Sequence, residues 1–199
     1  MPGMLIAFEG LDQSGKQTQA EMLRDYLKSQ GHRVRLLSFP DYGTSIGEEI
    51  ARALQGERSY GPDVMQLLYV ANRYERREEI RRWLDGGVTL VCDRYVASSV
   101  AYGEAQGVDP AWLIEIQRYL PQPHVTFLLD IAPETAARRK AADRDKYERD
   151  LAMLGRVRDS YRRQAGDGWV CLDGERHRDQ VAADVAEAVA AQLAQSSAP

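Results

Sequence analysis

The sequence predicts an α/β protein in which a doubly wound, five-stranded parallel sheet carries helices on both faces. Five short apolar runs recur along the 199 residues, and stretches with helical periodicity separate them. The runs do not alternate with polar residues, which is typical of parallel strands buried on both faces. Strands that alternate with helices form such a sheet, and its ligands bind at the carboxyl ends of the strands.

The expected strands are short and rich in β-branched or aromatic residues. They cover residues 4–8, 34–38, 88–92, 125–131 and 169–172. Because the runs are apolar throughout, we expect all five strands to be fully buried.

The expected helices show apolar residues at three- and four-residue intervals or begin with a capping signal. They cover residues 16–30, 64–84 and 179–194, with further helices starting at Asp109–Pro110 and Ala132–Pro133. The apolar face of the second helix would contain Leu67, Leu68, Ala71 and Ile80. The charged stretch 74–82 on the same helix is expected to face solvent and to carry no chemistry.

Composition predicts one domain, residues 1–199, because a chain of this length buries about 70% of its unfolded surface. A net charge of −4 argues against a nucleic acid or an anionic membrane as partner. No apolar run reaches the length of a membrane span and residues 1–10 lack a signal-peptide core, which predicts a cytoplasmic protein. Cys92 and Cys171 lie in apolar runs without metal-ligand spacing, so we expect buried, reduced thiols.

A phosphate-binding loop follows the first expected strand. Gly10, four further residues and then Gly15-Lys16 separate the apolar run from a helix. Glycines let the backbone curl so that successive N–H groups point at a phosphate, and the lysine reaches the terminal phosphates of a nucleotide. The candidate ATP-binding residues are Gly10, Leu11, Asp12, Gln13, Ser14, Gly15, Lys16, Gln17 and Thr18. Gln17 departs from the pattern, which has Ser or Thr there to hold Mg²⁺.

Polar residues also follow the second and third expected strands, at the edge of the sheet where the loop lies. Asp93 could bind Mg²⁺ through water while Arg94 points at a phosphate, although an ordinary ion pair is the alternative. On the helix 64–84, Tyr69, Asn72 and Arg73 share a face. They could stack on a base and bond its edge, or they could be a core tyrosine with a surface arginine.

Charges of alternating sign fill residues 138–149. This segment is either a solvated helix or a mobile flap that closes over the site, excludes water and brings arginines to a transferred phosphoryl group.

Together these motifs resemble the thymidylate kinase family, from residue 4 to about residue 173. The markers are the loop Phe8–Asp12 with Gly15-Lys16, then Phe39-Pro40, Ala71-Asn72-Arg73, Asp93-Arg94-Tyr95 with Ser98 and Tyr102, and Tyr147-Glu148. The resemblance implies a P-loop nucleoside monophosphate kinase fold and transfer of a phosphoryl group from ATP to dTMP with Mg²⁺. It also implies a homodimer formed through helix packing, although the apolar face of 64–84 is equally compatible with packing on the sheet.

The resemblance implies a role for each matching residue. Lys16 would hold the ATP phosphates, Arg94 the monophosphate and Arg73 the thymine edge, while Tyr102 would disfavour a ribose. The residues expected to bind dTMP are Asp12, Phe39, Tyr42, Tyr69, Arg73, Arg94, Ser98, Ser99 and Tyr102. The residues expected to act in catalysis are Asp12, Lys16, Arg94, Arg139 and Arg144.

Some positions depart from the family. With Gln17 in the loop, the metal falls to Asp12, Asp93, Glu9 or Glu148. Gln13 stands where some members have an arginine, so the catalytic arginine would come from the flap as Arg139 or Arg144. Asp41-Tyr42 stand where many members have a phosphate-binding arginine, and the Tyr42 hydroxyl would take over that contact. For the N3 edge of thymine, Ser98 and Ser99 are both candidates.

Two other functions stay open. One is a related P-loop kinase with another nucleotide or nucleoside as acceptor, which Tyr69 and the altered phosphate contact leave room for. The other is a nucleotide-binding protein that has lost catalysis through Gln17. Neither alternative changes the expected fold.

Overall fold

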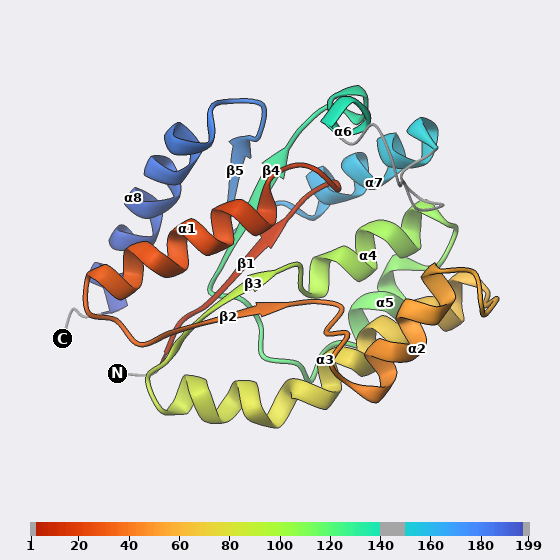
Figure 1. Ribbon diagram of the computed structural model, residues 1–199, viewed down its shortest axis with the longest axis horizontal. Coiled ribbons are helices and arrows are strands. Elements are labelled where there is room, and N and C mark those ends of the chain that lie inside the picture. Colours follow the sequence, from red (N-terminus) through yellow and green to blue (C-terminus); the bar gives the residue numbers. More distant parts are fainter. Residues whose placement is uncertain (1–2, 140–149, 197–199) are drawn as a thin grey trace.

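Residues 3–139 and 150–196 are described by the computed structural model, and they form the predicted doubly wound α/β fold (Figure 1). The five strands in this part of the chain are all parallel and lie in the order β2-β3-β1-β4-β5. Their bounds are β1 Leu5–Glu9, β2 Val34–Ser38, β3 Thr89–Asp93, β4 Val125–Asp130 and β5 Trp169–Asp173. Each expected strand is therefore confirmed.

Helices connect the strands. Their bounds are α1 Lys16–Ser29, α2 Ser45–Leu54, α3 Pro62–Asp85, α4 Val96–Ala105, α5 Pro110–Glu115, α6 Pro133–Arg139, α7 Leu151–Gln164 and α8 Arg178–Ser196. The helix starts predicted at residues 16, 110 and 133 are confirmed. The sequence did not predict α2, α4 and α7. No helix in the described ranges is both long and apolar enough to cross a membrane.

The two faces of the sheet follow from the alternation of side chains along each strand. In β1, Ile6 and Phe8 enter the core beneath α1 and α8, whereas Leu5 and Ala7 enter the core beneath α3. A third apolar cluster joins α4, α6 and α7 to β4. Figure 1 shows α1 and α8 together on one side of the sheet and α3, α4 and α7 on the other.

Two expectations about burial are wrong. β2 and β5 are only partly buried, because they are the edge strands of the sheet and each packs against a single neighbouring strand. Cys171 lies on β5 and is exposed, whereas Cys92 on the interior strand β3 is buried.

The expected apolar face of α3 is also partly wrong. Ile80 is buried, but the side chain of Leu67 is 44% exposed. The residues that α3 buries in its first half include Gln66, Asn72 and Arg73. These polar groups are buried because this half of α3 packs against α2 and borders a cavity instead of covering the sheet.

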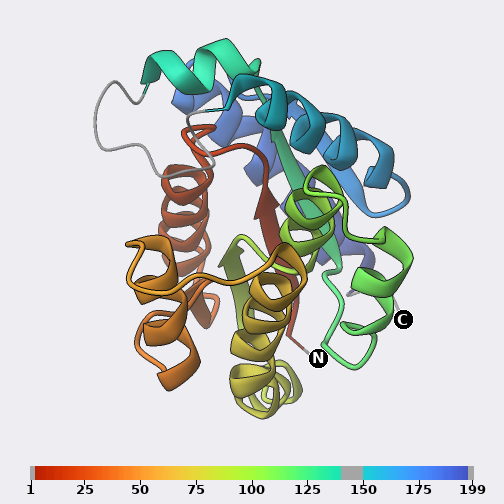
Figure 2. The ribbon, with the colours of Figure 1, turned by 90° about the vertical axis from the view of Figure 1, so that its right-hand side faces the viewer.

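The carboxyl ends of parallel strands meet at one edge of the sheet, and β1 lies in its middle between β3 and β4. The turn from β1 to α1 is therefore central at that edge. Figure 2 shows this turn between α2 and α3 on one side and α6 and α7 on the other. The fold thus brings the loops after β1, β2 and β3 together.

Candidate active site

The phosphate-binding loop has the tight backbone that its glycines predict. Gly10 has φ +137°, and a Cβ there would lie 2.5 Å from the carbonyl oxygen of Leu129. Gly15 precedes α1 with φ +96°, a left-handed conformation that L side chains rarely adopt. Both glycines are required by this geometry, and the loop ends where the amide groups of the first helical turn face outward.

Lys16 lies at the start of α1 with only 6% of its surface exposed. Its Nζ donates to the carbonyl oxygen of Leu11 at 2.7 Å, which fixes the ammonium group across the loop. Burial and the nearby guanidinium of Arg94 lower the pKa of Lys16 to about 8, against the opposing effect of Asp12. Among the described residues Lys16 Nζ has one hydrogen-bond acceptor for its three N–H groups, which leaves donors for a phosphate.

Arg94 and Asp12 form an ion pair beside the loop. Arg94 follows β3 with φ +63°, an unusual conformation for a residue with a side chain. The second Asp12 oxygen accepts a hydrogen bond from the Tyr102 hydroxyl at 3.0 Å. Burial opposes ionisation of Asp12, but Arg94 and Lys16 outweigh it and lower the pKa of the carboxyl group. An ordinary ion pair was the alternative that the sequence left open for Arg94, and the structure shows such a pair with Asp12.

Glu9 at the end of β1 orients Arg94 indirectly, through the Ser98 and Tyr161 hydroxyls that both residues contact. Its carboxylate accepts from the Tyr95 amide at 2.8 Å, the Ser98 amide at 3.2 Å, the Ser98 hydroxyl at 2.6 Å and the Tyr161 hydroxyl at 3.0 Å. Arg94 in turn donates to the Ser98 and Tyr161 hydroxyls at 3.1 and 3.2 Å. With its oxygens used in this way, Glu9 is a structural carboxylate and a poor metal ligand in this arrangement.

One cavity borders the ion pair and contains every residue that the sequence assigns to dTMP. Those nine residues line it together with four that were not predicted, namely Pro40, Leu54, Gln66 and Gln106. The phosphate-binding loop contributes Asp12, and the segment after β3 with α4 contributes Arg94, Ser98 and Tyr102. The segment after β2 contributes Phe39 and Tyr42. The structure thus brings residues from distant parts of the chain around a single cavity.

Arg73 is a buried wall of this cavity, which removes the alternative of a surface arginine. It is 3% exposed and donates to Ser99 Oγ at 2.8 Å and to Gln117 Oε1 at 3.3 Å. Its guanidinium carbon lies 6.0 Å from the centre of the Phe39 ring. Burial lowers the pKa of Arg73, but an arginine remains charged at neutral pH.

Of the four unpredicted lining residues, Gln66 is the one whose side chain is best suited to bind a ligand. It is 1% exposed, and its Oε1 is buried without a hydrogen bond to any described residue. Gly103 of α4 makes room for it, since a Cβ there would approach Gln66 Cγ to 3.1 Å. The spacing Gln66, Tyr69, Arg73 places all three on one face of α3, and this was the signal that could have identified Gln66 from the sequence.

The possible metal ligands differ in how well they are placed. Asp93 has a buried Oδ1 without a hydrogen bond in the described part of the chain, and burial raises the pKa of its carboxyl group. Gln17 is exposed and donates to Glu21 at 3.0 Å. Within residues 3–139 and 150–196, no cluster of three metal-binding side chains forms. A carboxylate with an unused oxygen beside a phosphate-binding loop fits Mg²⁺, which takes few protein ligands and keeps its waters and phosphates.

Of the predicted flap residues, only Arg138 and Arg139 are described, and Arg144 and Glu148 lie outside the described residues. Arg139 ends α6 and donates to the carbonyl oxygens of Gln13 at 3.1 Å and Gly174 at 3.0 Å. It therefore lies against the phosphate-binding loop.

Known proteins are similar to this chain in sequence and in fold. A family model described as thymidylate kinase matches residues 8–185. The chain is 35% identical to the thymidylate kinase of Plasmodium falciparum over 189 residues, which are 94% of this chain and 90% of that protein. It is 35% identical to that of Arabidopsis thaliana over 191 residues, 96% of this chain and 72% of that protein. A solved thymidylate kinase from Candida albicans, described as having broad substrate specificity and a novel structural element, superposes with a TM-score of 0.83 at 28% identity, over 96% of this chain and 93% of that one.

Proposed function

This chain belongs to the thymidylate kinase family, and from that membership we propose that it transfers the γ-phosphoryl group of ATP to dTMP, giving ADP and dTDP. The observation that carries the proposal is the single cavity beside the phosphate-binding loop. Its lining combines the Asp12–Arg94 pair with the polar side chains of Arg73, Gln66 and Ser99. A nucleoside monophosphate likewise combines a charged phosphate with a hydrogen-bonding base.

Phosphoryl transfer depends mainly on holding donor and acceptor in line and on neutralising charge on the transferred group. In the proposed arrangement, Lys16 and the loop amides bind the ATP phosphates. Arg94 binds the monophosphate of dTMP, with the Tyr42 hydroxyl as a second contact. The two phosphate sites are adjacent because Arg94 also donates to the carbonyl oxygen of Gly10 in the loop, at 3.3 Å.

Asp12 orients the acceptor in this proposal. It holds Arg94 and the Tyr102 hydroxyl, so its carboxylate connects the phosphate end of the cavity with the sugar. Burial raises the pKa of Tyr102 well above the usual value for a tyrosine, so its hydroxyl remains a donor at neutral pH. Tyr102 beside the 2′ position of the sugar would disfavour a ribonucleotide.

Mg²⁺ bound with ATP would neutralise charge on the phosphate oxygens and orient them. Asp93 is the residue best placed to hold it through water, because its Oδ1 has no hydrogen bond in the described part of the chain, and Asp12 of the loop is a second candidate. Gln17 does not replace the usual hydroxyl ligand. Glu148 stays a predicted ligand without a described position.

The thymine edge is assigned to Arg73 and Gln66. Ser98, one of the two predicted candidates for N3, donates its hydroxyl to Glu9, and Ser99 accepts from Arg73. The amide oxygen of Gln66 has unused hydrogen-bonding capacity among the described residues. Thymine N3 carries a hydrogen, so it supplies the donor that Gln66 Oε1 lacks, whereas cytosine N3 is itself an acceptor.

The catalytic arginine stays a prediction, with Arg139 and Arg144 as candidates. The contact of Arg139 with Gln13 supports a role beside the ATP phosphates. The single-domain organisation with a flap at 138–149, the homodimer and the cytoplasmic location are further proposals. Light scattering of the purified protein and cell fractionation test the last two.

A coupled assay of ADP release tests the function. ATP, Mg²⁺ and each of dTMP, dUMP, dCMP, AMP and GMP are supplied to the purified protein, and Lys16→Ala controls for contaminating kinases. Selective turnover of dTMP is expected. Equal or better turnover of another acceptor would contradict the base assignment, and no turnover with ATP still bound would mean that catalysis has been lost. The panel is needed because broad specificity is described for the Candida relative.

A further inference from the structure

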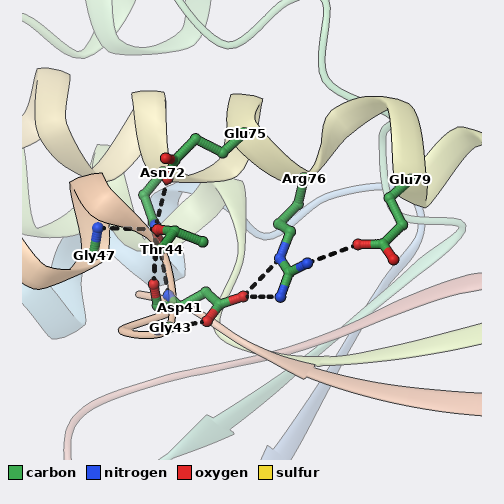
Figure 3. Close-up of polar contacts among 8 residues, drawn as sticks. All are labelled: Asp41, Gly43, Thr44, Gly47, Asn72, Glu75, Arg76 and Glu79. Atoms are coloured by element: carbon green, nitrogen blue, oxygen red, sulfur yellow. Dashed lines mark hydrogen bonds and ion pairs between the residues drawn. The ribbon is translucent and has the colours of Figure 1, made fainter.

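Residues 41–47, a loop that leads into the first turn of α2, are attached to α3 by hydrogen bonds and an ion pair (Figure 3). Tyr42 from this loop and Phe39 just before it line the cavity. The side chains that fasten it, Asn72 and Arg76, do not line the cavity and have no role in the function proposed above.

Asn72 holds the backbone of the loop. Its Oδ1 accepts from the Asp41 amide at 2.7 Å, and its Nδ2 donates to the Asp41 carbonyl at 3.1 Å and to Thr44 Oγ1 at 2.8 Å. Asn72 is fully buried, so these bonds do not compete with water. Both backbone polar groups of Asp41 are thereby fixed to α3.

Arg76, one turn further along α3, holds the side chain of Asp41. Its Nε and Nη2 approach Asp41 Oδ2 to 2.7 and 2.6 Å, and its Nη1 donates to Glu79 at 2.8 Å. Figure 3 shows the guanidinium between the two carboxylates. Arg76 belongs to the charged stretch 74–82 that was expected to face solvent, and its ion pair with Asp41 is a contact with the loop that this expectation did not include.

The loop has little freedom within this attachment. Thr44 Oγ1 donates to the Asp41 carbonyl at 3.1 Å and accepts from the Gly47 amide at 3.0 Å, which caps α2. A Cβ on Gly47 would lie 1.8 Å from the Asp41 carbonyl oxygen, so only glycine allows this approach. These contacts therefore hold the loop and the start of α2 in a fixed position on α3.

The same turn of α3 faces the cavity on its other side. Arg73 directly follows Asn72 in the chain, and Tyr69 lies one turn earlier. Residues that contact the base and residues that hold the loop thus share one rigid segment. The position of Tyr42 relative to Arg73 is set by the bonds of Asn72 and Arg76.

We infer that Asn72 and Arg76 are positioning residues for the acceptor nucleotide, because they fix Asp41 to α3 and so present Tyr42 to the monophosphate. Asp41 stands where many family members have an arginine. It attaches the loop to α3 through Asn72 and Arg76 and does not line the cavity. The inference rests on the proposed function, since it assigns the cavity to a nucleoside monophosphate. It predicts that loss of the Arg76–Asp41 contact weakens acceptor binding selectively.

The test compares Arg76→Gln, Asp41→Asn and the double variant with the wild-type protein. Arg77→Gln is the matched control, because Arg77 pairs only with its neighbour Glu78 among the described ion pairs. For each protein kcat, the KM for the acceptor, the KM for ATP and Tm are measured. We expect the acceptor KM to rise about three- to tenfold in both single variants, with kcat and the KM for ATP within twofold of wild type. The double variant should be no worse than either single one, and Arg76→Lys should restore part of the affinity.

Wild-type turnover with the acceptor panel is measured first, and the variants are compared on whichever acceptor it selects. A different acceptor would therefore overturn the assignment to dTMP without deciding the inference. An unchanged acceptor KM, with or without a lower Tm, would reduce Arg76 to a structural residue. A parallel rise in the KM for ATP, or additive effects in the double variant, would also overturn the inference.

Discussion

Asp12 and Arg94 lie 82 residues apart in the chain and pair with each other at the edge of the cavity. Each has therefore found a partner before any substrate arrives. Asp12 thereby holds the guanidinium in position. In the proposed complex the phosphate of the acceptor is a second anion on the same guanidinium, whose five N–H donors can serve both.

Replacement of Arg94 by alanine should raise the KM for dTMP at least about 30-fold, because loss of one partner of a buried charge pair costs about 2–5 kcal/mol. The KM for ATP should change much less. Steady-state kinetics measure both, with Arg163→Ala as control because Arg163 is exposed and pairs with Glu104. An unchanged KM for dTMP would remove Arg94 from phosphate binding.

Lys16 should give the enzyme a decline in activity at alkaline pH. Because the pKa of Lys16 is lowered to about 8, the cationic form is complete well below pH 8 and is lost as the pH rises through that value. The kcat/KM for ATP reports the free enzyme and should fall about tenfold per pH unit above pH 8. Bound phosphates hold the proton on Lys16, so kcat should decline only at higher pH. A kcat/KM profile that stays flat to pH 9.5 would contradict this assignment.

Replacement of Lys16 by alanine should reduce kcat about 100- to 1000-fold, as expected for loss of one preorganised charge contact. The control is Lys28→Ala, because Lys28 is exposed near the end of α1. Unchanged circular dichroism and Tm would show that the loss is chemical. Near-normal turnover would remove the loop lysine from the mechanism.

Gln17→Ser should leave kcat equal or higher and should lower the Mg²⁺ concentration that gives half-maximal activity. The Gln17 side chain is directed to Glu21 on the surface of α1, so its removal costs little. Serine adds the hydroxyl that phosphate-binding loops use for the metal. Titration of activity with Mg²⁺ measures the effect, and Gln17→Ala is the control. A tenfold loss in both variants would show that Gln17 has a specific role of its own.

Gln66→Leu should reduce the preference for dTMP over dCMP about tenfold or more, because the variant removes a hydrogen bond to N3. The kcat/KM values for the two acceptors are compared. Gln122→Leu, outside the cavity, is the control. If the ratio of the two kcat/KM values does not change, Gln66 does not discriminate between the two bases.

The sequence predicted the sheet and the polar loops at its edge from local patterns, whereas the assignment of Ser98, Ser99 and Tyr102 to the acceptor came only from the resemblance to the family. The loop from Gly10 to Lys16 and the pair Asp93-Arg94 follow directly after apolar strands, and parallel topology then places them at one edge. Helix α4 was missed because it is weak in local signals, whereas α2 and α7 were missed although each begins with a capping residue, Thr44 and Asp150. α4 contains two adjacent serines, a glycine and two valines, which are poor helix formers, and its helix is stabilised by packing against α7.

Gln66 and Arg76 were missed for a different reason. A glutamine or an arginine in a helix is most often exposed, and only the neighbouring elements reveal that it is buried or bonded across the chain. Leu67 is the complementary error, since an apolar residue was assumed to be buried when it is exposed. Tertiary contacts, which single-sequence patterns do not contain, decide all three cases.

The hydrogen bonds of the Glu9 carboxylate affect how the elements around the cavity unfold locally. It is bonded by the amide groups of Tyr95 and Ser98 from the start of α4 and by the Tyr161 hydroxyl from α7. Exchange of the two amide hydrogens with solvent requires β1, α4 and α7 to separate at this point. The phosphate side of the cavity therefore opens as one unit, and the bond from Arg73 on α3 to Ser99 on α4 ties the base side to it.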